Sequence, residues 1–191
     1  MMQRLGDLLL VRQGERHQVF YFLGLFFLVG AGMALGRGAS EALFFKRFGI
    51  EYLPLMYLFS CFSLCLVSLL YAAFVDRLPS EKFYRIFFTL LALLLFANWF
   101  AITFSNSELV YPVFFLLYEV ASELLLVHSA VYINQTFIQT QSKRLTPVIL
   151  AGHQVGVITG GVFLAAASPV LGVVNMMLVW VTLLLLAWLL V

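Results

Sequence analysis

The feature that most constrains this chain is a series of six apolar runs, each about as long as a helix that crosses a membrane. A spanning helix needs about 20 predominantly apolar residues, and the connections between the runs are short. The chain is 63% hydrophobic and 10% charged, far from the composition of a soluble domain. We therefore expect an all-α polytopic membrane protein with six transmembrane helices. The expected helices cover residues 19–45, 53–75, 82–104, 111–137, 146–167 and 170–191.

The segments outside and within these runs support the same class. Residues 1–18 alternate leucines with arginines, which predicts an amphipathic, cytoplasmic lead-in lying at the membrane interface. Cys61 and Cys65 lie one helical turn apart in the second run, where we expect small core residues rather than a disulfide or metal pair. The basic residues are spread over the loops, so no nucleic-acid partner is expected.

The distribution of Lys and Arg predicts the orientation of the chain. Cytoplasmic loops carry the excess of these residues, and eight lie on one side against three on the other. The eight are Arg4, Arg12, Arg16, Arg77, Lys82, Arg85, Lys143 and Arg144; the three are Arg37, Lys46 and Arg47. Both termini are therefore expected in the cytoplasm. The sixth run ends without a basic stop, which suggests a half-length chain.

A sequence echo links the two halves of the chain. The stretch GASEALFF at 38–45 is matched by VASELLLV at 120–127, so that Glu41 corresponds to Glu123 and Arg37 to Glu119. Repeated halves with inverted topology are common in transporters. We therefore expect two inverted three-helix repeats, residues 19–104 and 110–191, which together form half of a facilitator-type bundle.

Apart from Lys82 and Arg85 at the start of the third run, four charged residues lie inside the apolar runs. Such residues are costly in a membrane and usually face a bundle interior or an aqueous cavity. At 100° per residue, Glu119, Glu123 and Asn134 share one stripe of their helix, and Arg37 and Glu41 share a face one turn apart. We expect these residues to line a solute path. The alternative is a buried ion-pair cluster that only fixes helix register.

Two histidines within the runs lead to different expectations. His128 points away from the carboxylate stripe, so we expect it to be packed and hydrogen-bonded. His153 shares a face with Thr146 and with glycines 156 and 160. It could line the path and titrate near neutral pH. A helix-contact face of small residues with one hydrogen-bonded imidazole explains the same pattern equally well.

Motifs for catalysis, metal binding and ATP hydrolysis do not occur in the sequence. The pair Glu119-x3-Glu123 lacks the histidine of a di-metal motif, and no zinc spacing or nucleophile triad is present. No phosphate-binding Gly-x4-Gly-Lys-Ser/Thr loop occurs either. We expect no cofactor and no enzymatic activity, and any transport would be secondary.

The connection after the second run resembles a loop of the major facilitator superfamily. That loop reads Gly-x-x-x-Asp-Arg-x-Gly-Arg-Arg, and Asp76 and Arg77 match it, whereas Ala72 and Pro79 replace its two glycines. The resemblance implies that Asp76, Arg77 and Arg85 form a gating loop. An ordinary charged cytoplasmic turn is the alternative.

Three longer stretches resemble one branch of that superfamily, the ATP/ADP translocase-like nucleotide transporters and their bacterial relatives. Arg37 to Glu41 is similar to the Arg-x-x-Lys-Asp motif of the branch, with Ser40 in place of its lysine. Residues 70–85 and 134–160 carry the other two similarities. The resemblance implies exchange of a nucleotide-like solute in a bacterial inner (plasma) membrane.

These observations together predict a secondary transporter, or half of one, for a polar, anionic solute. The expected partners are membrane lipid, the small anionic solute, and a second half-transporter or a second copy of the chain. The expected path residues are Arg37, Glu41, Glu119, Glu123, Asn134 and His153. The alternative is a non-transporting membrane scaffold or sensor that keeps the transporter fold.

Overall fold

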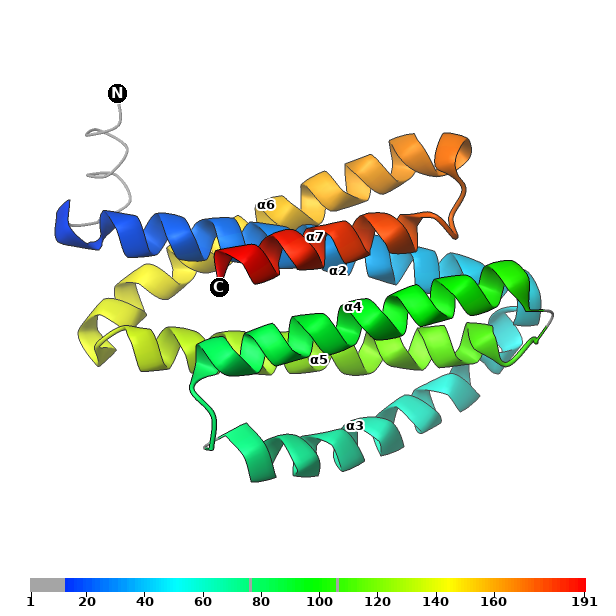
Figure 1. The fold of residues 1–191 in the computed structure, drawn as a ribbon, viewed down its shortest axis with the longest axis horizontal. Coiled ribbons are helices and arrows are strands. Elements are labelled where there is room, and N and C mark those ends of the chain that lie inside the picture. Colours follow the sequence, from blue (N-terminus) through cyan, green and yellow to red (C-terminus); the bar gives the residue numbers. More distant parts are fainter. Residues whose placement is uncertain (1–12, 76, 106) are drawn as a thin grey trace.

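The structure, a computed structural model, describes residues 13–75, 77–105 and 107–191. Over these residues it contains six α-helices and two short 3-10 turns, with no strand (Figure 1). The helices are α2 (Arg16–Phe48), α3 (Leu53–Val75), α4 (Ser80–Phe104), α5 (Val110–Thr136), α6 (Gln139–Leu171) and α7 (Met176–Leu190); the turns are η1 (Gln13–Glu15) and η2 (Ile50–Tyr52). Within this described part, α2 to α6 are each long and apolar enough to cross a membrane. The chain is therefore an all-α, multi-pass membrane protein, as predicted.

The first four helices follow the predicted apolar runs closely. Helix α3 has the predicted bounds, and α2, α4 and α5 begin and end within three residues of them. The predicted lead-in over 1–18 is only partly visible, because residues 1–12 lie outside the described part of the chain. Its last residues form η1 and the first turn of α2.

The predicted break at Ser168 and Pro169 is wrong. Pro169 lies inside α6, which continues to Leu171 and ends at Gly172. Gly172 has a φ of 81°, a left-handed conformation that glycine adopts without steric cost, and its N–H donates to the Ser168 carbonyl at 3.0 Å. Proline is tolerated in membrane helices because neighbouring groups satisfy the freed backbone. The glycine, rather than the proline, therefore ends the helix.

This shift shortens the last helix. Helix α7 has 15 residues, or about 22 Å at 1.5 Å per residue, against about 30 Å of hydrocarbon in a typical bilayer. It is apolar, but it falls below the length expected of a span. The prediction of six spanning helices is thus supported for five helices by their length and composition.

The predicted start of the fifth helix, residue 146, is also wrong. Helix α6 begins at Gln139, so Lys143 and Arg144 lie within it rather than in a loop. Arg144 Nη2 donates to both carboxylate oxygens of Glu15, at 2.7 and 2.6 Å, and Gln141 Nε2 donates to Oε1 at 3.0 Å. Glu15 is only 7% exposed. Its contacts join the first two turns of α6 to η1.

Helix α2 is the central element of the packing. It packs against α6, α7 and α5, while α5 packs against α3 and α4, and α4 packs against α7. Figure 1 shows α4 and α5 between α3 on one side and the group of α2, α6 and α7 on the other. Large buried side chains from α2, α4, α5 and α7 form the main core, including Phe22, Phe26, Phe88, Phe114 and Trp180.

Helix α3 lies at the edge of this arrangement. Only Met56 and Ser60 of α3 are buried, and Met56 packs with Phe44 and Phe115 in a small second cluster. Cys61 and Cys65 are free and exposed on α3. The prediction that they belong to the core is wrong, because α3 contributes little besides Met56 and Ser60 to the core.

Small residues allow other helices to approach α2 closely. A Cβ at Gly32 or Gly36 would lie 2.7 or 2.6 Å from atoms of the Trp180 ring. Gly156 and Gly160 of α6 lie against the backbone of α2, where a Cβ would collide with Phe27 and Ala31. Close backbone approach through small residues is typical of membrane helices. Gly156 and Gly160 therefore form the helix-contact face that one of the two predicted alternatives describes.

Candidate functional site

Arg37 and Glu41 form an ion pair within α2. Arg37 Nε lies 3.0 Å from Glu41 Oε1, and the two side chains are 68% and 35% exposed. Gly32 and Gly36 contact Trp180 of α7. The side of α2 that faces α7 is therefore the one that carries these glycines, and Arg37 and Glu41 lie on the other side. Arg37 and Glu41 therefore lie on the open side of the helix.

Ser40 does not share this open side. It is fully buried, and its Oγ donates to the Arg37 carbonyl at 3.0 Å. This is the position at which the expected resemblance to nucleotide transporters would place a lysine. A lysine side chain that pointed in the same direction as Ser40 would enter the packing around α2 and point away from the exposed ion pair.

Two carboxylates of α5 lie near the pair. Glu119 is half-buried and Glu123 is exposed, and Arg37, Glu41 and Glu123 all lie within electrostatic range of the Glu119 carboxyl group. Among the residues that the structure describes, no ion pair within 4.0 Å joins Arg37 to Glu119. We call these four residues the charged cluster. It contains one cation and three anions, and its cation is paired with one of them.

A cavity of about 330 Å³ lies between α2, α5 and α6. Its walls are mostly apolar, and it has four polar lining residues, namely Ser129, Thr146, His153 and Gln154. A largely apolar cavity of a few hundred Å³ with a few polar groups is typical of small-molecule sites. The structure thus places His153 and Thr146 together at this cavity, in addition to the helix contact made by the neighbouring glycines.

The cavity and the charged cluster follow the same helix faces. On α2, Met33 lines the cavity one turn before Arg37. On α5, Leu126 and Ala130 line the cavity and continue the stripe of Glu119 and Glu123 at helical spacing. The predicted carboxylate stripe therefore continues into the wall of a cavity.

The other predicted path residue, Asn134, does not line this cavity. It is exposed near the end of α5, and its Oδ1 accepts a hydrogen bond from Ser142 Oγ at 3.1 Å. Its role in the structure is a contact across the connection from α5 to α6.

Two of the predicted gating residues, Arg77 and Arg85, lie apart from the cavity. Asp76 lies outside the described residues. Arg77 is exposed, with its guanidinium group 5.9 Å from the Phe74 ring centroid. Arg85 donates from Nη2 to the Val191 carbonyl at 2.6 Å and so joins α4 to the end of α7.

His128 is packed and hydrogen-bonded, as predicted. It is 2% exposed; its Nδ1 lies 3.0 Å from Tyr71 Oη, and its Nε2 lies 3.2 Å from the Ser80 carbonyl oxygen. The Phe83 ring lies against it, with ring centroids 4.1 Å apart. His128 thus links α5 to α3 and α4.

Two buried polar features were not predicted. The Glu15–Arg144 pair joins residues 129 positions apart, and no local pattern indicates such a contact. Asn98 of α4 is 7% exposed, and its Oδ1 has no hydrogen-bond partner among the residues that the structure describes. A polar residue within an apolar span is a signal that sequence reasoning could have used for Asn98.

The chain was compared with protein-family models, with curated proteins and with solved structures, and none of them matches it.

Proposed function

We propose that this chain is a secondary membrane transporter, or half of one, for a polar solute. The observation that carries the proposal is the continuity between the charged cluster and the α2/α5/α6 cavity. Charged groups inside a spanning segment are costly and are usually retained for function. A cavity on the same helix faces provides volume for a solute beside them.

The pairing of the helices supports an arrangement of two inverted three-helix repeats. Helix α2 packs on α6 and α7, and its counterpart α5 packs on α3 and α4, the counterparts of α6 and α7. If each helix is replaced by its counterpart in the other repeat, the contact of α2 with α5 and the contact of α4 with α7 are unchanged. Such a pattern is expected of a half-bundle of the major facilitator type, in which transport requires movement against a second half. We propose that a second copy of the chain, or a separate second half, provides the other half of the bundle.

The charge of the cluster shapes the choice of solute. An anionic, nucleotide-like solute would need Arg37, and Arg37 is held by Glu41 at 3.0 Å. We propose that such a solute displaces Glu41 from the guanidinium group. If the solute is instead a cation, Glu119 and Glu123 are the natural ligands, because neither forms an ion pair within the described part of the chain.

Substitution of Glu41 distinguishes these cases. The purified chain is assayed for binding of ADP as the anion and putrescine as the cation, and then for uptake in liposomes. Glu41→Gln frees Arg37 and should strengthen ADP binding about tenfold, as expected when one hydrogen bond to a charged group becomes available. If the transported solute is instead a cation, Glu41→Gln should weaken the binding of putrescine.

Glu108→Gln is the matched control. Glu108 forms an exposed ion pair with Arg47 at 2.6 Å, and these residues do not line the cavity. This change should leave binding of both solutes unchanged. If no substitution in the charged cluster alters binding or uptake of any polar solute tested, the transporter proposal fails, and the scaffold or sensor becomes the better explanation.

A further inference from the structure

Two polar side chains on the wall of the α2/α5/α6 cavity have no role in the packing. They are His153 and Gln154 of α6. The other two polar lining residues, Ser129 and Thr146, each lie within hydrogen-bond distance of a neighbouring side-chain oxygen, at 2.7 and 3.3 Å. No hydrogen bond joins the side chain of His153 or Gln154 to any residue that the structure describes. The cavity wall therefore presents an imidazole and a carboxamide that can bind a solute.

Both side chains lie near the middle of a spanning helix. His153 is fourteen residues after Gln139, where α6 begins, and eighteen before Leu171, where it ends. Hydrocarbon offers no hydrogen-bonding partner at this depth, so polar side chains there usually face a cavity or a polar partner. Solute sites of secondary transporters also lie near the bilayer midplane. The imidazole and the carboxamide are thus placed to meet a polar group inside the cavity.

The contact between α6 and α2 fixes the position of His153. A Cβ at Gly30 of α2 would collide with the His153 carbonyl oxygen and would lie 3.2 Å from the ring carbon Cδ2. Gly152 and Gly156, on either side of His153, also lie against α2. Side chains on rigid, closely packed helices hold a precise geometry. The imidazole is therefore held at one level of the cavity wall.

The separation between this level and the charged cluster sets a length for the solute. Gly30, which contacts His153, lies seven residues before Arg37 on α2, about 10 Å along the helix axis. The cavity wall near the cluster is apolar, with Met33 on α2 and Leu126 on α5. A solute that reaches both ends therefore needs a charged group, an apolar middle and a neutral polar group.

We propose that the solute is an amphipathic ion whose neutral amide, or a similar group that both donates and accepts, lies about 10 Å from its charged group. Imidazole and carboxamide can each donate and accept a hydrogen bond, so His153 and Gln154 together match both sides of an amide. The apolar middle lies in the cavity, and the charged group reaches the charged cluster. This inference rests on the proposed transport function and names the class of its solute; the sign of the charge is decided by the Glu41 substitution described above.

The test measures binding to the whole chain in nanodiscs by equilibrium dialysis, with binding to empty nanodiscs subtracted. The probes are N-acetyl-α,ω-diaminoalkanes as cations and ω-acetamido carboxylates as anions, each with two, four, seven or ten methylene groups. Seven methylene groups in an extended chain separate the two ends by about 10 Å. We expect affinity in one of the two series to be highest at seven and to fall at ten. A steady rise to ten, as for simple burial of an apolar chain, overturns the proposal.

Two variants separate recognition of the amide from packing. His153→Phe should lower the affinity for the seven-methylene acetamide about fivefold, the size of one net hydrogen bond. Gln154→Leu should have the same effect. Neither should change the affinity for an alkyl ion of the same length and charge that lacks the amide. Equal losses for the two ligands would assign both residues to packing and overturn the proposal. If either variant does not fold, the length series on the unmodified chain still decides the question.

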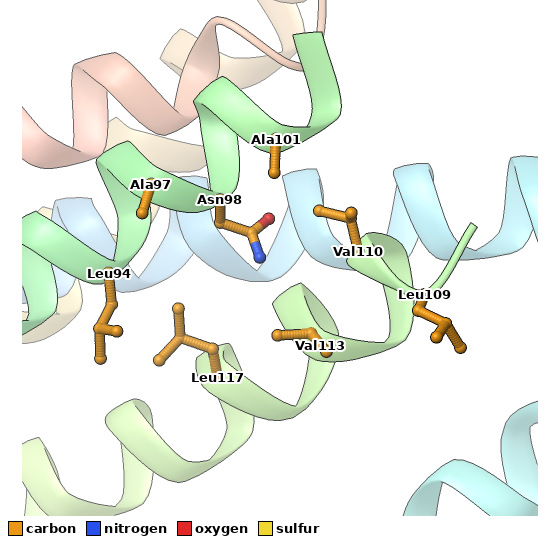
Figure 2. Close-up of a pocket in the computed structure, with 8 residues that line it drawn as sticks. All are labelled: Leu94, Ala97, Asn98, Ala101, Leu109, Val110, Val113 and Leu117. Carbon is orange, nitrogen blue, oxygen red and sulfur yellow. The ribbon is translucent and has the colours of Figure 1, made fainter. Parts of the chain in front are cut away.

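Two alanines provide a matched control for the position of the solute. Ala130 lines the α2/α5/α6 cavity, and Ala97 lines a separate groove of about 360 Å³ between α4 and α5. Figure 2 shows Ala97 on α4, beside Asn98 in that groove. Both alanines are exposed. Ala130→Leu should weaken acetamide binding about tenfold by filling the cavity, whereas Ala97→Leu should change it by less than about twofold. The reverse order overturns the proposal.

The outcomes distinguish this inference from the transport proposal on which it rests. If Glu41→Gln alters binding of ADP or putrescine but His153→Phe changes the binding of no acetamide, the transport proposal stands and the inference is wrong. If no substitution alters binding of any of these solutes, both are wrong. A second copy of the chain is the competing partner. If Gln154→Leu changes the oligomeric mass in detergent and not acetamide binding, Gln154 contacts a second copy and the inference is wrong.

Discussion

Arg37 pairs with Glu41 one turn along its own helix, with Nε and Oε1 3.0 Å apart, and not with Glu119 across the interface with α5. The sequence echo that aligns Arg37 with Glu119 therefore places two residues in the same region without joining them in an ion pair. Both side chains of the actual pair are accessible, so the pair can open without unpacking the bundle.

The first prediction concerns this pair. A double-mutant cycle of Arg37→Ala with Glu41→Ala should give a coupling of about 0.3 to 0.5 kcal/mol, the usual value for an exposed helix pair one turn apart. The cycle of Arg37→Ala with Glu119→Ala should give a smaller coupling. Unfolding in detergent, followed by circular dichroism, measures both. A coupling of several kcal/mol between Arg37 and Glu119 would show that they form a buried pair.

The second prediction concerns the buried contact between η1 and α6. Arg144→Ala removes the Arg144 guanidinium group from the buried carboxylate of Glu15, and breaking such a buried pair should cost about 3 to 5 kcal/mol. Lys143→Ala is the control, because Lys143 is exposed and should change stability by less than about 0.5 kcal/mol. Chemical unfolding of the detergent-solubilised chain measures the difference. Equal effects of the two substitutions would contradict the buried pair.

The third prediction uses two glycines of α6 with different surroundings. A Cβ at Gly156 would collide with the α2 backbone at Phe27, whereas a Cβ at Gly161 would meet nothing within 4 Å. Gly156→Ala should destabilise the chain by about 1 to 3 kcal/mol through overpacking. Gly161→Ala should be neutral or stabilise by up to about 1 kcal/mol through helix propensity. Thermal unfolding of the two variants in one detergent makes the comparison, and the reverse order would contradict the packing of α6 on α2.

The fourth prediction separates the two histidines. His128→Phe removes hydrogen bonds to Tyr71 and Ser80 in a buried site, and the loss of these two buried bonds should cost about 1 to 3 kcal/mol. His153→Phe changes a cavity-lining residue that is only partly buried. It should have a smaller effect on stability and a larger one on solute binding. Paired measurements of unfolding and of binding test this, and a loss of stability at His153 equal to that at His128 would assign both residues to packing.

Much of the architecture could be predicted from the sequence, because membrane insertion acts on local composition. The apolar runs located α2 to α5 within three residues, since a spanning helix must satisfy its own backbone in lipid. Helical periodicity also predicted the shared stripe of Glu119 and Glu123 and the placement of His128 away from it, because the direction of a side chain along a helix follows from its spacing.

Other features were decided only by the tertiary structure. The sequence predicted a break at Ser168 and Pro169, but α6 continues through the proline and ends at Gly172. Cys61 and Cys65 are exposed because α3 packs at the edge of the bundle.

The partners of the charged residues also depended on the fold. Arg144, expected in a basic cytoplasmic loop, binds Glu15, 129 positions earlier in the sequence. Composition and periodicity determine where most of the helices lie and which residues share a face of a helix. They do not determine which distant side chain a charge will meet, because that choice depends on how far each helix extends and on which small residues let two backbones approach.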